Sequence, residues 1–122
     1  MTPTLVVLVG LGGAAGSALR FGADSWLRPL FAGAISWPTL IINVSGSLLL
    51  GILTGLFAAD APALAILGTG AMGGYTTLST ASVEAATLLL TRRFGLALVY
   101  ALGTLILSVA GAITGLWVGS SL

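Results

Sequence analysis

The residues best suited to chemistry in this sequence lie in the segment 73–80, Gly-Gly-Tyr-Thr-Thr-Leu-Ser-Thr. Two adjacent glycines and four Thr or Ser residues suit a continuous lipid-facing helix poorly, yet they lie in an uncharged stretch, Ala61 to Val83, that is long enough to cross a bilayer. A helix break at that depth leaves peptide groups without partners, which is tolerated only where protein, water or an ion satisfies them. Such breaks form ion sites in channels and transporters. The segment therefore predicts that a small charged species crosses a membrane here.

Further polar side chains recur one helical turn apart in two other apolar stretches. They are Thr39, Asn43 and Ser47 in the first stretch and Tyr100, Thr104 and Ser108 in the second. A serine or threonine hydroxyl can bond to the carbonyl four residues earlier, whereas an unpaired buried carboxamide costs several kcal/mol. We therefore expect Asn43 either to join two helices or to donate to an ion on its path. For an anion, the useful groups are amide and hydroxyl protons and the positive edges of aromatic rings.

The composition places the whole chain among membrane proteins. Its 122 residues include only four arginines and three acidic residues, and its mean hydropathy is +1.16. Histidine and cysteine are absent, which excludes the usual zinc, haem, thiol and imidazole chemistry and any disulfide. A net charge of +1 gives no basic surface for nucleic acid. The sequence predicts one domain, residues 1–122, that is an all-α integral membrane protein and not an enzyme.

Charged residues and prolines divide the chain into four apolar spans, with a polar connection after Arg20 that holds Asp24 and Arg28. We expect the spans to lie within 1–19, within 31–59 with a start near Trp37 or Thr39, from Pro62 to the Thr91-Arg92-Arg93 turn, and within 94–122. The first has 19 residues and the other three have more, so each is long enough to cross about 30 Å of hydrocarbon, which takes roughly 20 residues. The first span has no positively charged start and contains glycines, so we favour a membrane helix over a cleaved signal peptide.

Glycines recur four residues apart along these spans. The pairs are Gly12 and Gly16, Gly51 and Gly55, Gly70 and Gly74, and Gly111 and Gly115. This spacing places each pair on one face of a helix, where small residues let two backbones approach closely. We expect these faces to form helix–helix contacts.

Three blocks of residues carry a resemblance to a known family. They are Gly12-Gly-Ala-Ala-Gly16 leading to Arg20, Trp37-Pro-Thr-Leu-Ile-Ile-Asn43 leading to Gly46 and Gly51, and Gly70-Ala-Met-Gly-Gly-Tyr-Thr-Thr-Leu-Ser-Thr80 leading to Glu84. In their order and spacing they resemble the bacterial fluoride channel family, Fluc, also called CrcB-like. The resemblance implies a fluoride-selective channel in the lipid of the bacterial plasma (cytoplasmic) membrane. It also implies four transmembrane helices with the third broken at mid-membrane, and an antiparallel dual-topology dimer with two narrow pores.

The resemblance further implies roles for individual residues. A structural sodium ion at the centre of the dimer interface would be held by the backbone carbonyls of Gly73 and Thr76 from each subunit. The polar groups of the ion pathway would be Asn43, Ser79, Thr80, Tyr100 and Ser108. A bound cation would offset part of the desolvation cost of the anion, and loose binding by many weak donors would permit passive flow.

Two charged residues near the ends of spans could form a vestibule. Arg20 either draws anions toward the pathway or reaches the lipid headgroups. Glu84 is the only acid near the interior of a span, and intramembrane carboxylates are functional by default. The alternative for Glu84 is an interfacial ion pair with Arg92 or Arg93.

The chain departs from the family it resembles at three positions. The family has two pore phenylalanines where this chain has Leu78 and Ala81, neither of which offers an aromatic edge to an anion, and Ala112 stands where the family often has a further hydroxyl. All four arginines fall on or near one side of the expected arrangement, which predicts insertion with both termini outside. A fixed orientation favours a heterodimer with an oppositely oriented homologous subunit over a homodimer.

Two other functions stay open. A non-conducting structural or assembly subunit is consistent with the missing phenylalanines and the glycine-rich faces. A small four-span multidrug exporter has a similar length, but its chemistry needs a carboxylate in the first span, and Met1 to Leu19 has none.

Overall fold

Helices make up nearly all of the chain in the computed structural model, which describes residues 2–33 and 35–122 and, for Ser79, the backbone alone. The elements are α1 (Pro3–Leu27), the 3-10 turn η1 (Arg28–Leu30), α2 (Trp37–Leu56), the π-helical segment η2 (Leu64–Met72), α3 (Gly73–Tyr75), α4 (Leu78–Leu90) and α5 (Phe94–Ser120). The described residues contain no strand. The predicted all-α class is confirmed.

Three of these elements are long and apolar enough to cross a membrane unaided, namely α1 continued by η1, then α2, then α5. The Thr2 hydroxyl caps α1 by accepting the Leu5 N–H at 3.2 Å. Helix α2 begins at Trp37, as predicted, and Pro38 occupies its first turn, where a missing amide proton costs nothing. The chain is a multi-pass membrane protein.

The first helix is longer than we expected. Instead of a polar connection after Arg20, α1 continues to Leu27, so Arg20 and Asp24 are both helical. One reason is that Asp24 lies one turn before Arg28, whose Nε and Nη2 atoms donate to the Asp24 carboxylate at 3.1 and 2.6 Å. Pro29 then removes the next backbone donor, and the helix gives way to η1.

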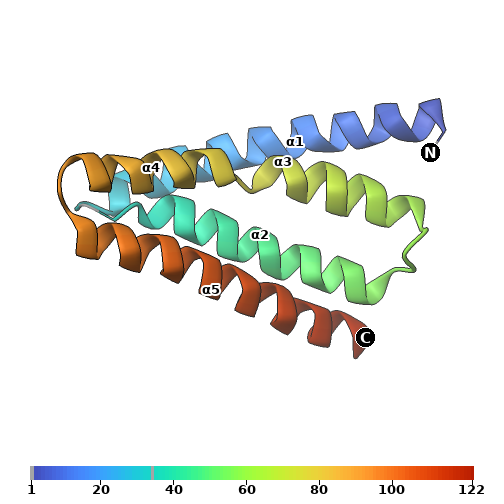
Figure 1. The fold of residues 1–122 in the computed structure, drawn as a ribbon. Helices are drawn as coiled ribbons and strands as arrows, with labels where there is room; N and C mark the ends of the chain where they lie inside the picture. The colour runs from blue at the N-terminus through green and yellow to red at the C-terminus, as the bar shows by residue number, and fades with distance from the viewer. Residues whose placement is uncertain (1, 34) are drawn as a thin grey trace.

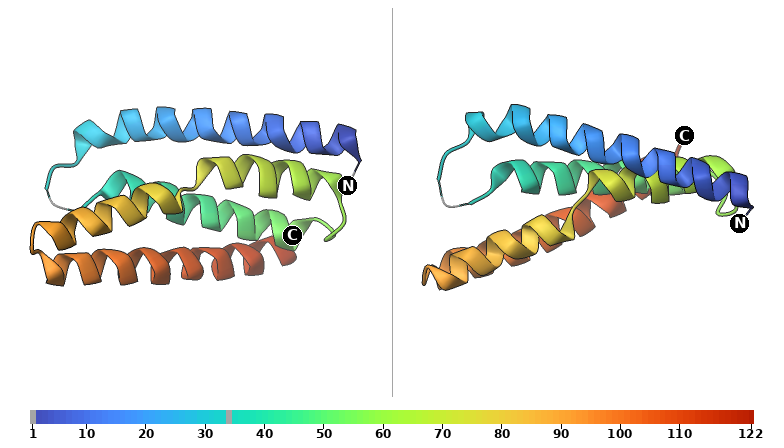
Figure 2. Two further views of the ribbon diagram at one scale, coloured as in Figure 1. Left: turned by 45° about the horizontal axis from the view of Figure 1, so that its top comes forward. Right: turned by 90° about the horizontal axis from the view of Figure 1, so that it is seen from above.

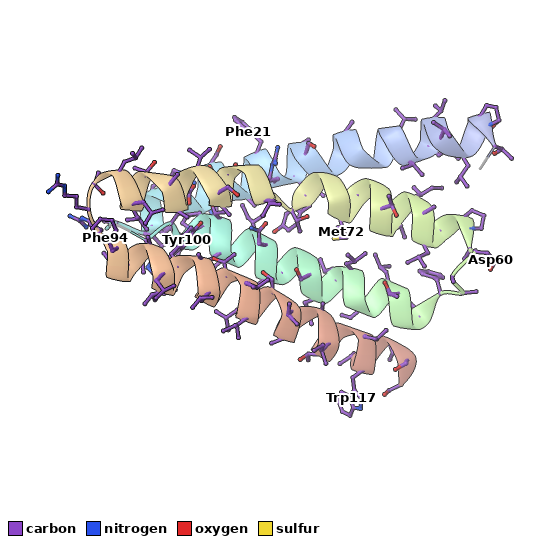
Figure 3. The ribbon with its side chains drawn as sticks, in the orientation of Figure 1. Phe21, Asp60, Met72, Phe94, Tyr100 and Trp117 are labelled. Carbon is purple, nitrogen blue, oxygen red and sulfur yellow. The ribbon has the colours of Figure 1, made fainter. Side chains whose placement is uncertain are left out.

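The helices run alternately in opposite directions along one bundle axis (Figure 1). Both termini lie at the same end as the connection between α2 and η2, which contains Asp60 (Figures 1 and 3). The opposite end holds the α1–α2 and α4–α5 connections, and therefore Arg92 and Arg93. Helix α2 makes its most extensive contacts with α5, whereas α1 packs on η2 and α3.

Glycine faces produce the closest of these contacts. A Cβ atom on Gly12 would lie 2.6 Å from the Ile66 carbonyl oxygen, and one on Gly55 would lie 2.6 Å from the carbonyl oxygen of Leu116. Gly111 likewise faces the Val44 carbonyl oxygen of α2. Backbone therefore rests directly on backbone, and the prediction that the paired glycines form helix–helix contacts is confirmed.

The segment between Pro62 and Leu90 is interrupted at Thr76 and Thr77. Both residues have extended backbone, with φ −79° and ψ 158° at Thr76 and φ −146° and ψ 115° at Thr77. Before the interruption the segment packs on α1; after it, α4 packs on α5 and diverges from α1, as Figure 2 shows. The predicted break within residues 73–80 is confirmed, and it lets one segment change neighbours halfway along the bundle.

Candidate functional site

The side chain of Asn43 satisfies the interrupted backbone. Its Nδ2 atom donates to the Thr77 carbonyl at 2.8 Å, and its Oδ1 atom accepts the Thr77 N–H at 2.7 Å. Both residues are buried, so these bonds replace partners that a continuous helix would have supplied. Asn43 thus joins α2 to the break, which is the first of the two roles expected for it. Its second amide proton finds no acceptor among the described residues, so that proton is available to a ligand.

Thr77 also starts the helix that follows. Its hydroxyl oxygen accepts the Thr80 N–H at 3.1 Å, which makes it the N-cap of α4. The same hydroxyl donates to the Thr80 hydroxyl at 3.2 Å. Sequence reasoning did not single out Thr77, although a threonine just before a renewed apolar stretch is a recognisable capping signal.

The carbonyls of Gly73 and Thr76 have lost their helical partners. In a continuous helix they would accept from the amides four residues later, at Thr77 and Thr80. Those amides instead donate to Asn43 and to the Thr77 hydroxyl. Within the described part of the chain neither carbonyl accepts another hydrogen bond. These are the two oxygens expected to bind sodium, and uncommitted carbonyl oxygens are the ligand type that hard cations take.

A cavity of about 370 Å³ lies beside the break. Three of the expected pathway residues, Asn43, Tyr100 and Ser108, line it. Its other polar lining residues are Ser47, Thr76, Thr77, Ser82 and Thr104. The hydroxyls of Thr104 and Ser108 are buried and have no hydrogen-bond partner among the described residues. Buried hydroxyls without partners, facing a cavity, are suited to donate to a bound ligand.

Leu78 and Ala81 line the same cavity. The two positions at which the resemblance implied phenylalanines therefore belong to the wall of this cavity. Leu78 is 82% exposed, whereas Ala81 is 8% exposed. Neither side chain offers a polar or aromatic group, so this part of the wall contributes no donor.

A smaller cavity of about 180 Å³ lies toward the end of α1. Arg20, expected in the vestibule, and Thr80, expected in the pathway, both line it, together with Arg28 and Thr39. Thr77 lines this cavity as well as the larger one. The structure thus places Asn43, Tyr100 and Ser108 at one cavity and Arg20 and Thr80 at another, and Thr77 lines both. The side chain of Ser79, also expected in the pathway, lies outside the described part.

Glu84 is held by hydroxyl groups from two other helices. The Thr39 hydroxyl donates to Oε1 at 3.0 Å and the Tyr100 hydroxyl donates to Oε2 at 2.9 Å. Its ionic partner is Arg28, whose Nη2 atom lies 3.7 Å from Oε1. The expected alternative, an ion pair with Arg92 or Arg93, is wrong for the described structure, because the carboxylate faces α2 and α5 rather than the turn beyond α4. No local sequence signal predicts the contact with Arg28, which depends on the unforeseen length of α1.

Comparison with known proteins identifies the family. A family model described as "CrcB-like protein, Camphor Resistance (CrcB)" matches residues 7–116. A protein of Leifsonia xyli subsp. xyli named fluoride-specific ion channel FluC 1 is 40% identical over 122 residues, which cover 98% of this chain and 89% of that protein. The fluoride-specific ion channel FluC of Thermus thermophilus is 39% identical over 119 residues, or 95% of this chain and 94% of the relative.

A third relative gives the same result. Fluoride-specific ion channel FluC 2 of Bacillus subtilis is 45% identical over 112 residues, which cover 89% of this chain and 82% of that protein. The family match runs from α1 into α5 and spans the break and both cavities. On these grounds the chain belongs to the CrcB-like family.

Proposed function

We propose that this chain is a subunit of a fluoride-selective channel that lowers cytoplasmic fluoride by passive export across the bacterial plasma membrane. The observation that carries the proposal is the break at Thr76 and Thr77 beside a cavity lined by amide and hydroxyl donors. Fluoride is assigned because the CrcB-like relatives are named fluoride-specific ion channels. A channel needs no catalytic group, and the chain is not an enzyme.

The chemistry of the cavity suits a small, strongly hydrated anion. A selective path replaces the hydration shell of the ion with many weak donors at close range, while binding stays loose enough for exit. The remaining amide proton of Asn43 and the hydroxyls of Thr104 and Ser108 are donors of this kind. The Tyr100 hydroxyl lines the same cavity, but its one proton is donated to Glu84 in this structure. Arg20 and Thr80, in the smaller cavity, extend the path toward the arginine-rich end.

The channel requires a fourth crossing, which we assign to the segment from Pro62 to Leu90. Its two helical halves follow one another along the bundle, with the break between them (Figure 1). In this arrangement the break lies at mid-membrane, where the Asn43 side chain and a bound ion satisfy the exposed peptide groups. Such a site on a two-fold axis calls for an antiparallel dimer, in which each subunit supplies the same carbonyls.

A structural sodium ion fits the Gly73 and Thr76 carbonyls, because the amides that would otherwise bind them are committed elsewhere. When bound, sodium would supply a fixed positive charge close to the anion path. The protein's own contribution is to keep hydrogen-bond donors away from these two carbonyl oxygens. Asn43 and the Thr77 hydroxyl do this by taking up the Thr77 and Thr80 amide protons.

The partner in the dimer is either a second copy or a homologous subunit inserted the other way. All four arginines lie toward the α1–α2 and α4–α5 end, which favours a single orientation for this chain. The cavity wall lacks aromatic groups at Leu78 and Ala81. Both features favour a heterodimer whose partner supplies the aromatic edges, and the second also fits a non-conducting assembly subunit.

Fluoride efflux from liposomes tests the proposal. The purified chain, alone and co-expressed with an oppositely oriented homologue, is reconstituted into vesicles loaded with fluoride, and release is followed with a fluoride electrode; chloride-loaded vesicles provide the control anion. We expect fluoride release with no matching chloride release. Properly assembled protein that releases no fluoride in either combination would contradict the proposal and favour the assembly role.

A further inference from the structure

Arg28 connects two acidic residues that belong to different helices. Its guanidinium donates to the Asp24 carboxylate of α1 at 3.1 and 2.6 Å, and its Nη2 atom lies 3.7 Å from Oε1 of Glu84 in α4. The Arg28 side chain is 49% exposed, whereas Glu84 is only 22% exposed. The cation is therefore open to the surroundings, and the acid behind it is largely covered.

Arg28 also lines two adjoining hollows. One is the cavity of about 180 Å³ that contains Arg20, Thr77 and Thr80. The other, of about 230 Å³, is lined by Glu84 and Ser36 among others. The smaller hollow reaches the break at Thr77, so an ion that moves through it from the arginine-rich end passes this guanidinium.

The charge on Glu84 opposes the function proposed for its neighbours. Its carboxylate accepts the hydroxyl protons of Thr39 and Tyr100, and Tyr100 lines the large cavity. A carboxylate at this position repels an approaching anion and competes with it for the same donors. Among the described residues, Arg28 is the one cation within 4 Å of Glu84. Because the guanidinium also pairs with Asp24, it offsets only part of the charge on Glu84.

We propose that Arg28 is a positioning residue for anion entry, whose guanidinium offsets part of the negative charge of Glu84 so that a small anion can approach Tyr100 and Thr39 from the arginine-rich end. The inference rests on the proposed channel function. It assigns Asp24 the supporting role of holding the guanidinium between the two carboxylates. It also distinguishes Arg28 from Arg92 and Arg93, which lie at the same end of the bundle but form no ion pair with Glu84 in the described structure.

The absence of cysteine from the natural sequence allows a sharp test. Arg28→Cys protein is assembled, purified and then modified with a methanethiosulfonate reagent that adds either an ammonium or a sulfonate group. Because modification follows folding, both adducts form on the same assembled protein, and the main difference between them is the sign of the added charge. Arg93→Cys, modified in the same way, is the matched control. Fluoride efflux from liposomes is measured at about 0.01 M and about 1 M of a salt with an impermeant anion, where the screening length is about 30 Å and about 3 Å.

We expect the unmodified Arg28→Cys channel to release fluoride about tenfold more slowly than wild type at low salt, which is the low end of electrostatic effects on ion access. The ammonium adduct should recover most of the rate, the sulfonate adduct should be slower still, and high salt should bring the two adducts together. Equal rates for the two adducts at low salt, or the same response from Arg93→Cys, would overturn the inference. A wild-type channel without flux would instead contradict the proposed function.

Discussion

Asn43 and Thr77 lie 34 residues apart in sequence and hold each other by a closed pair of hydrogen bonds, with one donated by the side chain at 2.8 Å and one accepted by it at 2.7 Å. The pair satisfies both peptide groups of the residue at the gap, so the interrupted helix leaves neither the N–H nor the carbonyl of Thr77 without a partner. It also leaves the Gly73 carbonyl without its helical donor. One asparagine therefore stabilises the break and at the same time exposes the oxygen on which a cation site would depend.

Replacement of Asn43 by alanine should destabilise the fold by about 2–5 kcal/mol, because it leaves the buried N–H and the buried carbonyl of Thr77 without hydrogen-bond partners. Ser47→Ala is the matched control: Ser47 lies one turn further along α2 and lines the same cavity, but its hydroxyl forms no hydrogen bond with another described residue. Equilibrium unfolding in detergent, followed by circular dichroism, measures both variants. Equal losses for the two would mean that the Asn43–Thr77 pair contributes nothing specific.

Two glycines on α1 should respond in opposite directions to substitution by alanine. A Cβ atom at Gly12 would lie 2.6 Å from the Ile66 carbonyl oxygen, so Gly12→Ala forces α1 away from η2. A Cβ atom added at Gly10 would meet no atom of another segment within 4 Å, and alanine there should raise helix stability by up to about 1 kcal/mol. The fraction of monodisperse protein after heating, read by size-exclusion chromatography, should fall for Gly12→Ala and not for Gly10→Ala. A well-assembled Gly12→Ala protein would contradict the close contact between α1 and η2.

The sequence predicted those features that depend on local composition. The paired glycines and the polar run at 73–80 each carry a physical signal, since small residues permit contact and hydroxyl residues disfavour a continuous lipid-facing helix. The predicted end of the first helix was wrong, because the charge of Arg20 suggested that the apolar span ended there. In the structure the helix continues through Asp24 to a side-chain pair with Arg28.

Contacts between segments that are distant in sequence could not be predicted from local sequence patterns. Asn43 was expected to find a partner, but its choice of Thr77 depends on how α2 packs against the break. The contact between Arg28 and Glu84 requires both the extension of α1 and the course of α4. A threonine at the N-cap position, as at Thr77, is the one missed residue that capping rules alone could have identified.

Sodium should raise the thermal stability of the assembled protein if it binds the bare carbonyls of Gly73 and Thr76. A ligand that binds only the folded state stabilises it by mass action, by about 1.4 kcal/mol for each tenfold rise in concentration above the dissociation constant. The midpoint of thermal unfolding should therefore rise with the logarithm of sodium concentration. The same series with N-methylglucamine chloride controls for ionic strength. Identical midpoints in the two series would exclude a sodium site in the folded protein.

Aromatic side chains restored to the cavity wall should increase fluoride flux through the chain reconstituted without a partner. Leu78 lines the cavity and is 82% exposed, so Leu78→Phe should change the free energy of unfolding by less than about 0.5 kcal/mol while it supplies a ring edge to the anion. Ala81 is buried, and Ala81→Phe should cost about 1–3 kcal/mol unless its ring enters the cavity.

Leu90→Phe is the control for Leu78→Phe, because Leu90 is equally open at 84% exposure but lies at the far end of α4 and does not line the cavity. Electrode-detected efflux from liposomes at equal protein density should rise for Leu78→Phe alone. Such a rise would mean that the missing aromatic edge limits conduction through the chain on its own. If Leu78→Phe and Leu90→Phe release fluoride at the same rate, the cavity wall at position 78 does not limit the flux, and the argument for a complementary partner would rest on the arginine distribution alone.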